Sequence, residues 1–145
     1  MSIAQTTTTS FRVELFEAVH NFNTDTFKIA LYTGAADIGP DTTAYTATGE
    51  ASGTGYTAGG NTLTISTTPT YGTNAYGAIT AYVSFANSSW AAASFTARGA
   101  LIYNSSKSNK SVAVLDFGAD KTVTAGTFTV QFPTADANSA IVRIS

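Results

Sequence analysis

The sequence predicts a mainly β protein, an antiparallel β-sandwich or jelly-roll-like domain with one N-terminal helix. Threonine occurs 26 times among 145 residues, and its β-branched side chain fits a pleated, half-exposed surface. Charged residues make up only 11% of the chain, against about 25% in an average domain, so hydroxyl groups must solvate much of the surface. Several short segments alternate apolar and polar residues between turn signals, and no helices alternate with them, which favours antiparallel pairing.

The length of 145 residues predicts a single domain, and a hydrophobic fraction of 43% supplies it with a core. Residues 1–10 are rich in threonine and carry few apolar residues. We expect them to form an extended N-terminal arm that is ordered only when it is tied to a partner. Residues 11–145 are expected to form the β-sandwich domain.

The one predicted helix covers residues 11–22. Four apolar residues recur at helical spacing and form a stripe along it: Phe11, Leu15, Val19 and Phe22. Ser10 is the expected N-cap, and Glu14 lies in the first turns, where the helix dipole favours an anion. The polar segment after residue 22 is expected to end the helix.

The rest of the chain has the pattern of seven or eight short strands. The segments with this pattern are 26–33, 61–67, 77–86, 93–104, 111–118, 120–123, 127–132 and 140–145. The segment 111–118 is nearly all apolar, which predicts a central strand covered on both faces, and Gly99 is a candidate β-bulge. Residues 37–60 carry many turn signals and are expected to form a long mobile surface loop.

A cluster of five glycines lies in the segment 49–60. A phosphate-binding P-loop needs a lysine and a hydroxyl residue after its last glycine, whereas Gly60 is followed by Asn61 and Thr62. A dinucleotide-binding loop opens a helix, but this segment opens a strand pattern. We therefore predict glycines at positive φ that turn the chain into a strand.

The side chains needed for familiar catalytic sites are sparse. The chain has no cysteine and a single histidine, His20, which we interpret as a surface or boundary residue near the end of the helix. Asp37, Asp41 and Glu50 lie in one loop and leave a calcium site open as a lesser alternative to a solvated loop. We predict that the protein is not an enzyme and that it holds no cofactor or metal.

Charge and hydropathy also limit the partners. The net charge is −2, and the seven basic residues are scattered, so nothing in the chain resembles the basic stripe of a nucleic-acid-binding protein. No apolar run approaches the roughly 18–20 residues of a membrane span. The first ten residues lack the pattern of a secretory signal, and we expect synthesis in the cytoplasm without membrane association.

Aromatic residues are the best candidates for partner binding. The segment 69–77 carries Tyr71 and Tyr76 without an alternating pattern, and exposed aromatic side chains stack on sugars or anchor interfaces. Packing in the core or within a hairpin is the alternative. With the N-terminal arm and the glycine-rich loop, the predicted partner-binding residues are Ile3, Thr6, Thr8, Tyr56, Tyr71 and Tyr76.

Four segments carry a resemblance to a known class of proteins: FKIALYTGAA, TAYTATGEASGTGYTAGG, ARGALIYNSSKSNKSVAVLDFG and TFTVQFP. Together they resemble small virion structural proteins of tailed phages, with the head decoration (cement) proteins as the nearest group. The resemblance extends from about Phe27 to the C-terminus. It rests on strands and turns and involves no catalytic signature.

This resemblance implies a non-enzymatic β-sandwich that binds the outer surface of the assembled head, bridges capsid subunits and stabilises them. It also implies that the glycine-rich loop is a surface that conforms to a neighbouring protein. The implied partners are the major capsid protein and further copies of the chain, as a dimer or trimer on a symmetry axis. The implied location is the capsid surface of the virion, after synthesis in the host cytoplasm. The alternative is a tail or fibre module that binds a host glycan or another tail protein.

Overall fold

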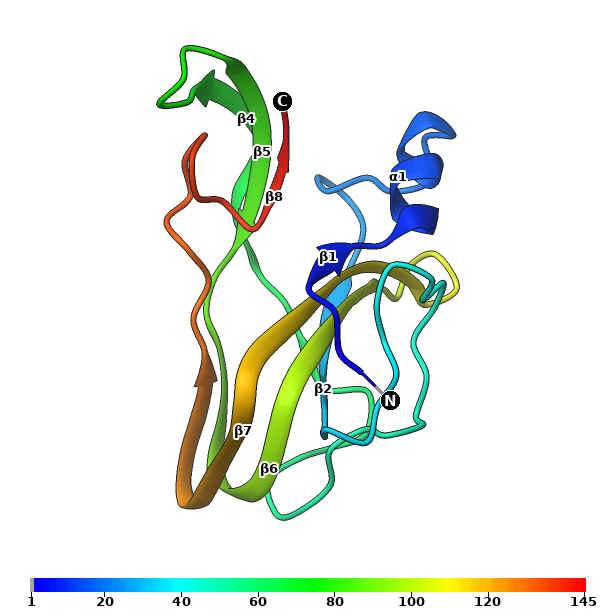
Figure 1. The fold of residues 1–145 in the computed structure, drawn as a ribbon, viewed down its shortest axis with the longest axis vertical. Coiled ribbons are helices and arrows are strands. Elements are labelled where there is room, and N and C mark those ends of the chain that lie inside the picture. The colour runs from blue at the N-terminus through cyan, green and yellow to red at the C-terminus, as the bar shows by residue number, and fades with distance from the viewer. Residues whose placement is uncertain (1) are drawn as a thin grey trace.

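The computed structural model describes residues 2–145, which form two antiparallel sheets and one short helix (Figure 1). The predicted mainly β, sandwich-like fold is confirmed. In chain order the elements are β1 (Thr6–Thr7), α1 (Thr9–Phe16), β2 (Phe27–Tyr32), β3 (Asn61–Thr62), β4 (Ile65–Thr73), β5 (Ile79–Phe85), β6 (Ser88–Asn104), β7 (Lys110–Val130) and β8 (Val142–Ile144).

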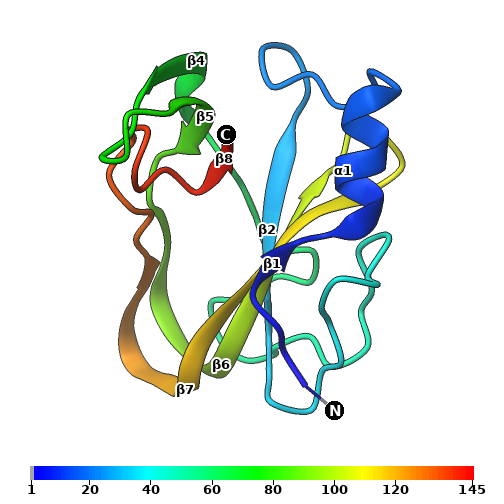
Figure 2. The same ribbon diagram turned by 45° about the horizontal axis from the view of Figure 1, so that its top comes forward.

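The larger sheet has the strand order β1-β7-β6-β2-β3, and the smaller sheet has the order β4-β5-β8. Strands β6 and β7 form a long hairpin that curves along its length (Figures 1 and 2). Register shifts interrupt their pairing, and one of them lies between Ala97 and Gly99, so the bulge predicted at Gly99 is confirmed. Only two residues separate β5 from β6, and the two sheets therefore meet at the start of β6.

The segment 61–67, predicted as one strand, belongs to both sheets. The Leu63 amide donates to the Phe27 carbonyl of β2 at 2.8 Å, whereas the Thr64 carbonyl accepts from the Ala86 amide after β5 at 2.8 Å. The chain thus leaves the larger sheet and enters the smaller one between residues 63 and 64. The alternation of apolar residues continues through this crossing, which is why the sequence pattern does not reveal it.

The larger sheet is covered on both faces. Phe27, Ile29 and Leu31 of β2 point into the main core, as their alternation predicts, together with aromatic residues such as Phe85 and Phe95. On the other face, a second cluster forms around Ala30, Tyr32, Leu101, Tyr103 and Val114, and it is closed by Ala36 and Ile38. Residues 111–115 of β7 are all buried, which confirms the first part of the predicted central strand 111–118, whereas residues 116–118 are not buried. The segments predicted as separate short strands at 120–123 and 127–132 begin within the same long strand β7.

The predicted helix 11–22 is wrong at both ends. The helix α1 begins after Thr8, whose hydroxyl accepts a hydrogen bond from the Phe11 amide at 3.3 Å, so Thr8 and not Ser10 is the N-cap. Thr8 is fully buried and its hydroxyl also lies 2.9 Å from that of Ser111 on β7. This tertiary contact fixes the start of the helix, which a helical stripe alone cannot do.

The end of the helix is likewise set by the backbone. Ala18 has a φ of 57°, a left-handed conformation that an α-helix does not continue through. Phe22 is still buried in the main core and stacks on Phe27, with ring centroids 4.4 Å apart, but it reaches the core from the turn after α1.

The N-terminal residues are extended, but they lie along the chain's own domain. The Ser2 carbonyl accepts from the Ile38 amide, and the Ala4 amide donates to the Ile38 carbonyl, each at 3.0 Å. Further on, Thr6 and Thr7 pair with β7 as an edge strand. The boundary expected at residue 10 therefore falls inside α1.

Candidate functional site

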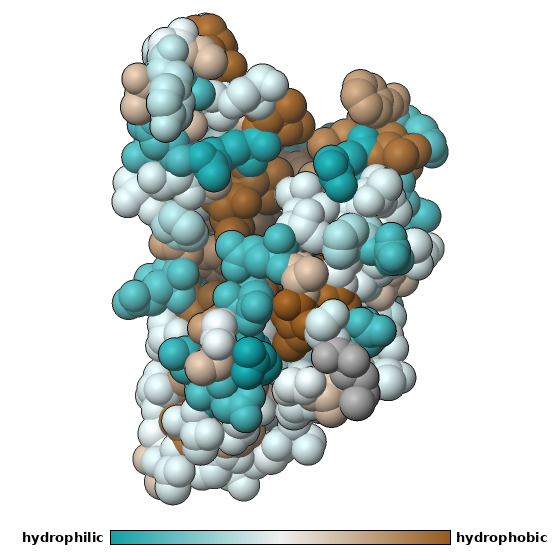
Figure 3. All heavy atoms as spheres, viewed as in Figure 1, coloured by the Kyte–Doolittle hydropathy of each residue, from teal (hydrophilic) through white to brown (hydrophobic). Residues whose placement is uncertain are grey.

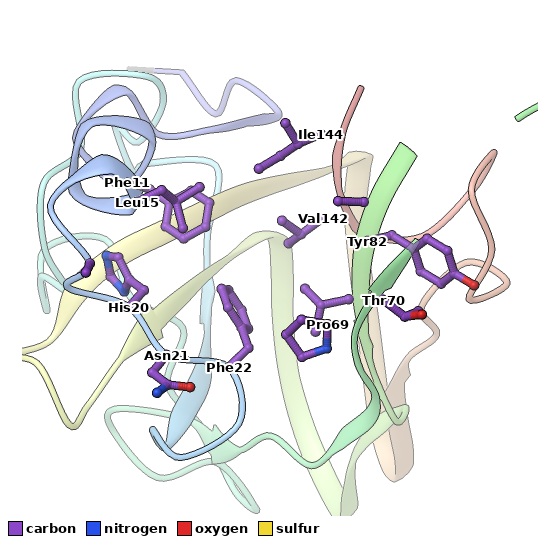
Figure 4. A pocket seen from close by; sticks show the side chains of 13 residues that line it. Phe11, Leu15, His20, Asn21, Phe22, Pro69, Thr70, Tyr82, Val142 and Ile144 are labelled. Carbon is purple, nitrogen blue, oxygen red and sulfur yellow. The ribbon is translucent and has the colours of Figure 1, made fainter. Parts of the chain in front are cut away.

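An apolar cleft separates α1 from the smaller sheet (Figure 3). Its inner part has a volume of about 360 Å³ and is lined by Phe11 and Leu15 on one side and by Pro69, Val83 and Val142 on the other. Figure 4 shows Phe11 and Leu15 on one side of the opening, and Pro69 and Val142 on the other. An outer part of about 440 Å³ continues it, with Phe16 and Ile144 among its walls.

One face of the smaller sheet forms a wall of the cleft. Residues that pair across antiparallel strands share a face, and the register pairs Val83 with Val142, and Ala81 with both Tyr71 and Ile144. Val83 and Val142 are buried, whereas Tyr71 is 72% exposed and Ile144 is 55% exposed. This face of the smaller sheet is therefore apolar both where it lines the cleft and where it is exposed to solvent.

The helix adds apolar surface on the other side of the cleft. Phe16, the last residue of α1, is 95% exposed, although a phenylalanine side chain stabilises a fold only when it is buried. We call the exposed apolar residues Phe16, Tyr71 and Ile144, together with the lining of the cleft, the cleft face. Large exposed apolar patches are typical of interaction sites, and the cleft face is the best candidate site of the molecule.

The predicted partner-binding residues fall into two groups. Ile3 packs on the second core cluster, Thr6 lies in β1, and Thr8 is buried as the N-cap, so these three serve the fold of the chain itself. Tyr71 and Tyr76 are exposed on the β4–β5 hairpin, Tyr76 to 95% in its turn. Of this set, the structure brings Tyr71 alone to the cleft face.

Tyr56, the remaining predicted residue, belongs to a structural cluster. Its hydroxyl donates to Glu50 at 2.7 Å and accepts from the Leu31 amide at 2.9 Å. The carboxylate of Glu50 also accepts from the Tyr45 hydroxyl and the Gly59 amide, each at 2.7 Å. Burial and the neighbouring carboxylate raise the pKa of Tyr45 to about 12 and raise that of Tyr56 as well. The cluster ties the loop to β2.

The loop 37–60 is thus a cover for the larger sheet. Isolated bridges join it to three strands: Glu50 to Tyr32, Ala44 to Lys110, and Thr54 to Ser94. The interpretation of this segment as a mobile surface that conforms to a neighbour is not supported by this packing, because its inner side closes the second core cluster. Its four glycines from residue 53 to residue 60 do have positive φ, as predicted.

Metal binding has no obvious site in the part of the chain that the structure describes. Within residues 2–145, no three histidine, aspartate or glutamate side chains converge in a manner suited to a metal ion. Asp37 and Asp41 are exposed beside a polar hollow, while the oxygens of Glu50 accept three hydrogen bonds elsewhere. The same residues 2–145 include no helix of the length and apolar character that a membrane span requires.

His20 lies at the wall of the cleft and not at the surface. Its Nε2 is 3.0 Å from a Glu14 carboxylate oxygen, and its Nδ1 is 3.1 Å from the Asn104 side-chain nitrogen. The ammonium of Lys110 lies 2.9 Å from the other oxygen of Glu14, and Asp25 accepts from Asn104 at 2.8 Å. This polar cluster holds α1 and the following turn to β6 and β7.

The cluster predicts a loss of stability in acid. Burial raises the pKa of Glu14, but the bonds from Lys110 and His20 outweigh it, so the pKa lies below its usual 4.5. Burial raises the pKa of Asp25, but the hydrogen bonds from Asn104 and the Asn21 amide, together with the charge of Lys107, outweigh it and lower the pKa from its usual 3.8. A carboxyl group whose pKa is lowered by folding stabilises the folded state at pH values above its usual pKa. This contribution is lost as the pH falls through the pKa of the group in the folded state.

We expect the urea concentration at the midpoint of unfolding to decrease as the pH is lowered from 5 to about 2. The double variant Glu14→Gln with Asp25→Asn is expected to lose part of this pH dependence. Urea titrations followed by circular dichroism at closely spaced pH values measure both. An unchanged pH slope in the double variant would show that other carboxyl groups account for the effect.

The cleft face was missed by the analysis of the sequence. The predicted helical stripe includes Phe11 and Leu15, and Phe11 is buried. Phe16 follows Leu15 with nothing in the sequence to mark it as exposed. Ile144 lies in a predicted strand whose partner could not be known. Comparison of the chain with models of protein families, with curated proteins and with solved structures finds no match.

Proposed function

We propose that the protein is a non-enzymatic structural component of a phage virion, a decoration protein that binds the outer surface of the assembled head through its cleft face. The observation that carries the proposal is the exposure of Phe16, Tyr71 and Ile144 beside an open apolar cleft. Such a surface is stabilised when another protein covers it. The resemblance of the sequence to head decoration proteins supplies the identity of the partner.

Repetition on a symmetric shell suits a site of this size. The exposed apolar residues are few, and a single contact of this kind is expected to be weak. Many copies on one shell, each bridging neighbouring subunits, give a large combined stabilisation without a tight individual site. The major capsid protein is therefore the proposed partner, and self-association as a dimer or trimer belongs to the same proposal.

Heads that lack the protein provide the test. Adding the wild-type chain to such heads, prepared from the phage that encodes it, is expected to raise the temperature at which they release DNA. Phe16→Ser and Tyr71→Ser are expected to weaken head binding by about tenfold each, because truncating a central anchor residue costs more than about 1 kcal/mol. Cosedimentation measures binding, and dye fluorescence measures DNA release.

Tyr76→Ser is the matched control, because Tyr76 is as exposed as Phe16 but lies in the β4–β5 turn. We expect it to bind heads as the wild-type chain does. Heads that are no more heat-resistant with the protein than without it would contradict the proposal.

The alternative proposal is a tail or fibre module that binds a host glycan or another tail protein. It is favoured by the 95% exposure of Tyr76 at the tip of a hairpin, since an isolated aromatic ring is suited to stack on a sugar. Immunogold labelling of virions distinguishes the two proposals. Label on tails, together with loss of host-cell binding in Tyr76→Ser, would favour the alternative.

A further inference from the structure

We propose that the open edge of β8 and the outer part of the cleft together bind an extended segment of the partner protein. The segment carries apolar side chains on one face and a carboxylate close to α1. This inference rests on the proposed function, because it names the chemistry that the partner presents to the cleft face.

The backbone of β8 provides the first element of recognition. Within residues 2–145, β8 pairs with β5 alone, so its other edge is open. Figures 1 and 2 show β8 on the side of the smaller sheet that lies nearest to α1. An open strand edge offers unpaired N–H and C=O groups in a row and binds an extended peptide as an additional strand.

The side chains beside this edge provide the second element. Leu15, Phe16 and Ile144 wall the outer part of the cleft, whose volume is about 440 Å³. A strand added next to β8 continues the smaller sheet, and every second side chain then lies on the face shared by Val142 and Ile144. Those side chains would fill the outer cleft and cover Phe16. Because β8 has only three residues, the apolar contacts must contribute much of the affinity.

Charge provides the third element. Arg12 lines the outer cleft from α1, and within residues 2–145 it forms no ion pair. No aspartate or glutamate lines either part of the cleft in the described chain. Arg143 also lines the outer cleft, although it pairs with Tyr82 on the opposite face of β8 from Val142 and Ile144, and its guanidinium donates to the Asn138 carbonyl. The guanidinium of Arg12 donates a hydrogen bond to the Thr9 hydroxyl at 3.3 Å, which leaves its charge without a counter-ion among residues 2–145. It therefore favours a carboxylate on the bound segment.

A selection for binding peptides tests the inference with the intact chain. The probe is a library of random dodecapeptides displayed on their own mRNA and selected on the immobilised protein. We expect enriched peptides to alternate apolar residues and to carry an acidic residue. Their binding should weaken by about tenfold in Arg12→Gln and in Phe16→Ser, as expected for a charged and an apolar anchor.

Two controls make the result specific. Arg98→Gln removes a half-buried arginine that lies 3.9 Å from Asp120 and does not line the cleft, and it should bind the peptides as the wild-type chain does. Backbone hydrogen exchange should slow in residues 142–145 when the peptide is bound, because added strand pairing protects amides.

Several results would overturn the inference. They are the absence of enriched peptides, equal binding to Arg12→Gln and the wild-type chain, and unchanged exchange in residues 142–145. A dimer in sedimentation equilibrium that Phe16→Ser abolishes would also overturn it, because a second copy would then be the occupant. Head binding that persists without peptide binding refutes this inference alone, and peptide binding without head binding refutes the proposed function alone.

Discussion

Gly60→Ala is expected to destabilise the protein by about 3 kcal/mol or more. Gly60 has a φ of 75°, and a Cβ atom there would lie 1.8 Å from the carbonyl oxygen of Ile29. Ile29 is in the centre of β2 and fully buried, so its backbone cannot move aside without breaking the pairing of β2 with β3 and β6. The close approach of these two chain segments requires a residue without a side chain.

The cost of the clash can be separated from the cost of the backbone conformation. Gly77 has a similar φ of 81°, but a Cβ atom there would meet nothing within 4 Å. Gly77→Ala therefore loses only the freedom of glycine at positive φ, about 1 kcal/mol. Urea denaturation of the two variants measures the difference, and circular dichroism shows whether Gly60→Ala folds at all. Equal midpoints for the two variants would contradict the packing of Gly60 against β2.

Glu50→Ala is expected to cost about 3 kcal/mol, because it removes the acceptor of three hydrogen bonds to a charged group. The donors are Tyr45, Tyr56 and the Gly59 amide, and all three lose the carboxylate as their acceptor in this variant. Glu50→Gln keeps the shape and one acceptor oxygen, so its cost should be about 1 kcal/mol. Urea titrations of the two variants and the wild-type chain at pH 7 measure both changes in the free energy of unfolding.

Asp41→Ala is the matched control for Glu50, because Asp41 is an exposed carboxylate in the same loop. We expect it to change the midpoint little, as surface charges usually do. A midpoint for Glu50→Ala that equals that of Asp41→Ala would show that the tyrosine cluster does not hold the loop.

Both predictions concern the loop 37–60, whose role differs from the one expected. Its glycines were read as turn residues at the start of a strand, and this is confirmed, since Gly60 immediately precedes β3. The same glycines also allow the loop to approach the sheet closely. A Cβ atom at Gly53 would lie 2.3 Å from the Ser94 carbonyl oxygen, and one at Gly55 would lie 2.9 Å from the Cα of Ala93. The loop is therefore packed on β6 as well as on β2.

The candidate site could be predicted only in part. Tyr71 was identified from its position in a segment without alternation, and it is exposed on the cleft face. Phe16 and Ile144 were not identified, because both lie in or beside regular apolar patterns that are typical of a core. Exposure of such a residue depends on whether another element covers it, and α1 is too short to cover the smaller sheet.

The helix shows the same limit. The stripe from Phe11 to Phe22 contains residues that are buried, and the sequence predicts this correctly for Phe11 and Phe22. Their burial does not require one continuous helix, because the turn after Ala18 brings Phe22 to the core as well. The start of α1 depends on the contact between Thr8 and Ser111, two residues that lie far apart in the chain.

The sequence by itself determined the mainly β content, the buried position of residues 111–115 and the turns at glycine, because alternation and backbone freedom are local properties. Only the tertiary structure decided the crossing between sheets after Leu63, the packing of the glycine-rich loop and the opening of the cleft. Each of these depends on which surfaces meet, and contacts between distant segments leave no pattern in either segment alone. The segment 49–60 illustrates both cases. The conformation of its glycines is a local property that the sequence predicts, whereas its role as a cover for the larger sheet depends on the tertiary structure.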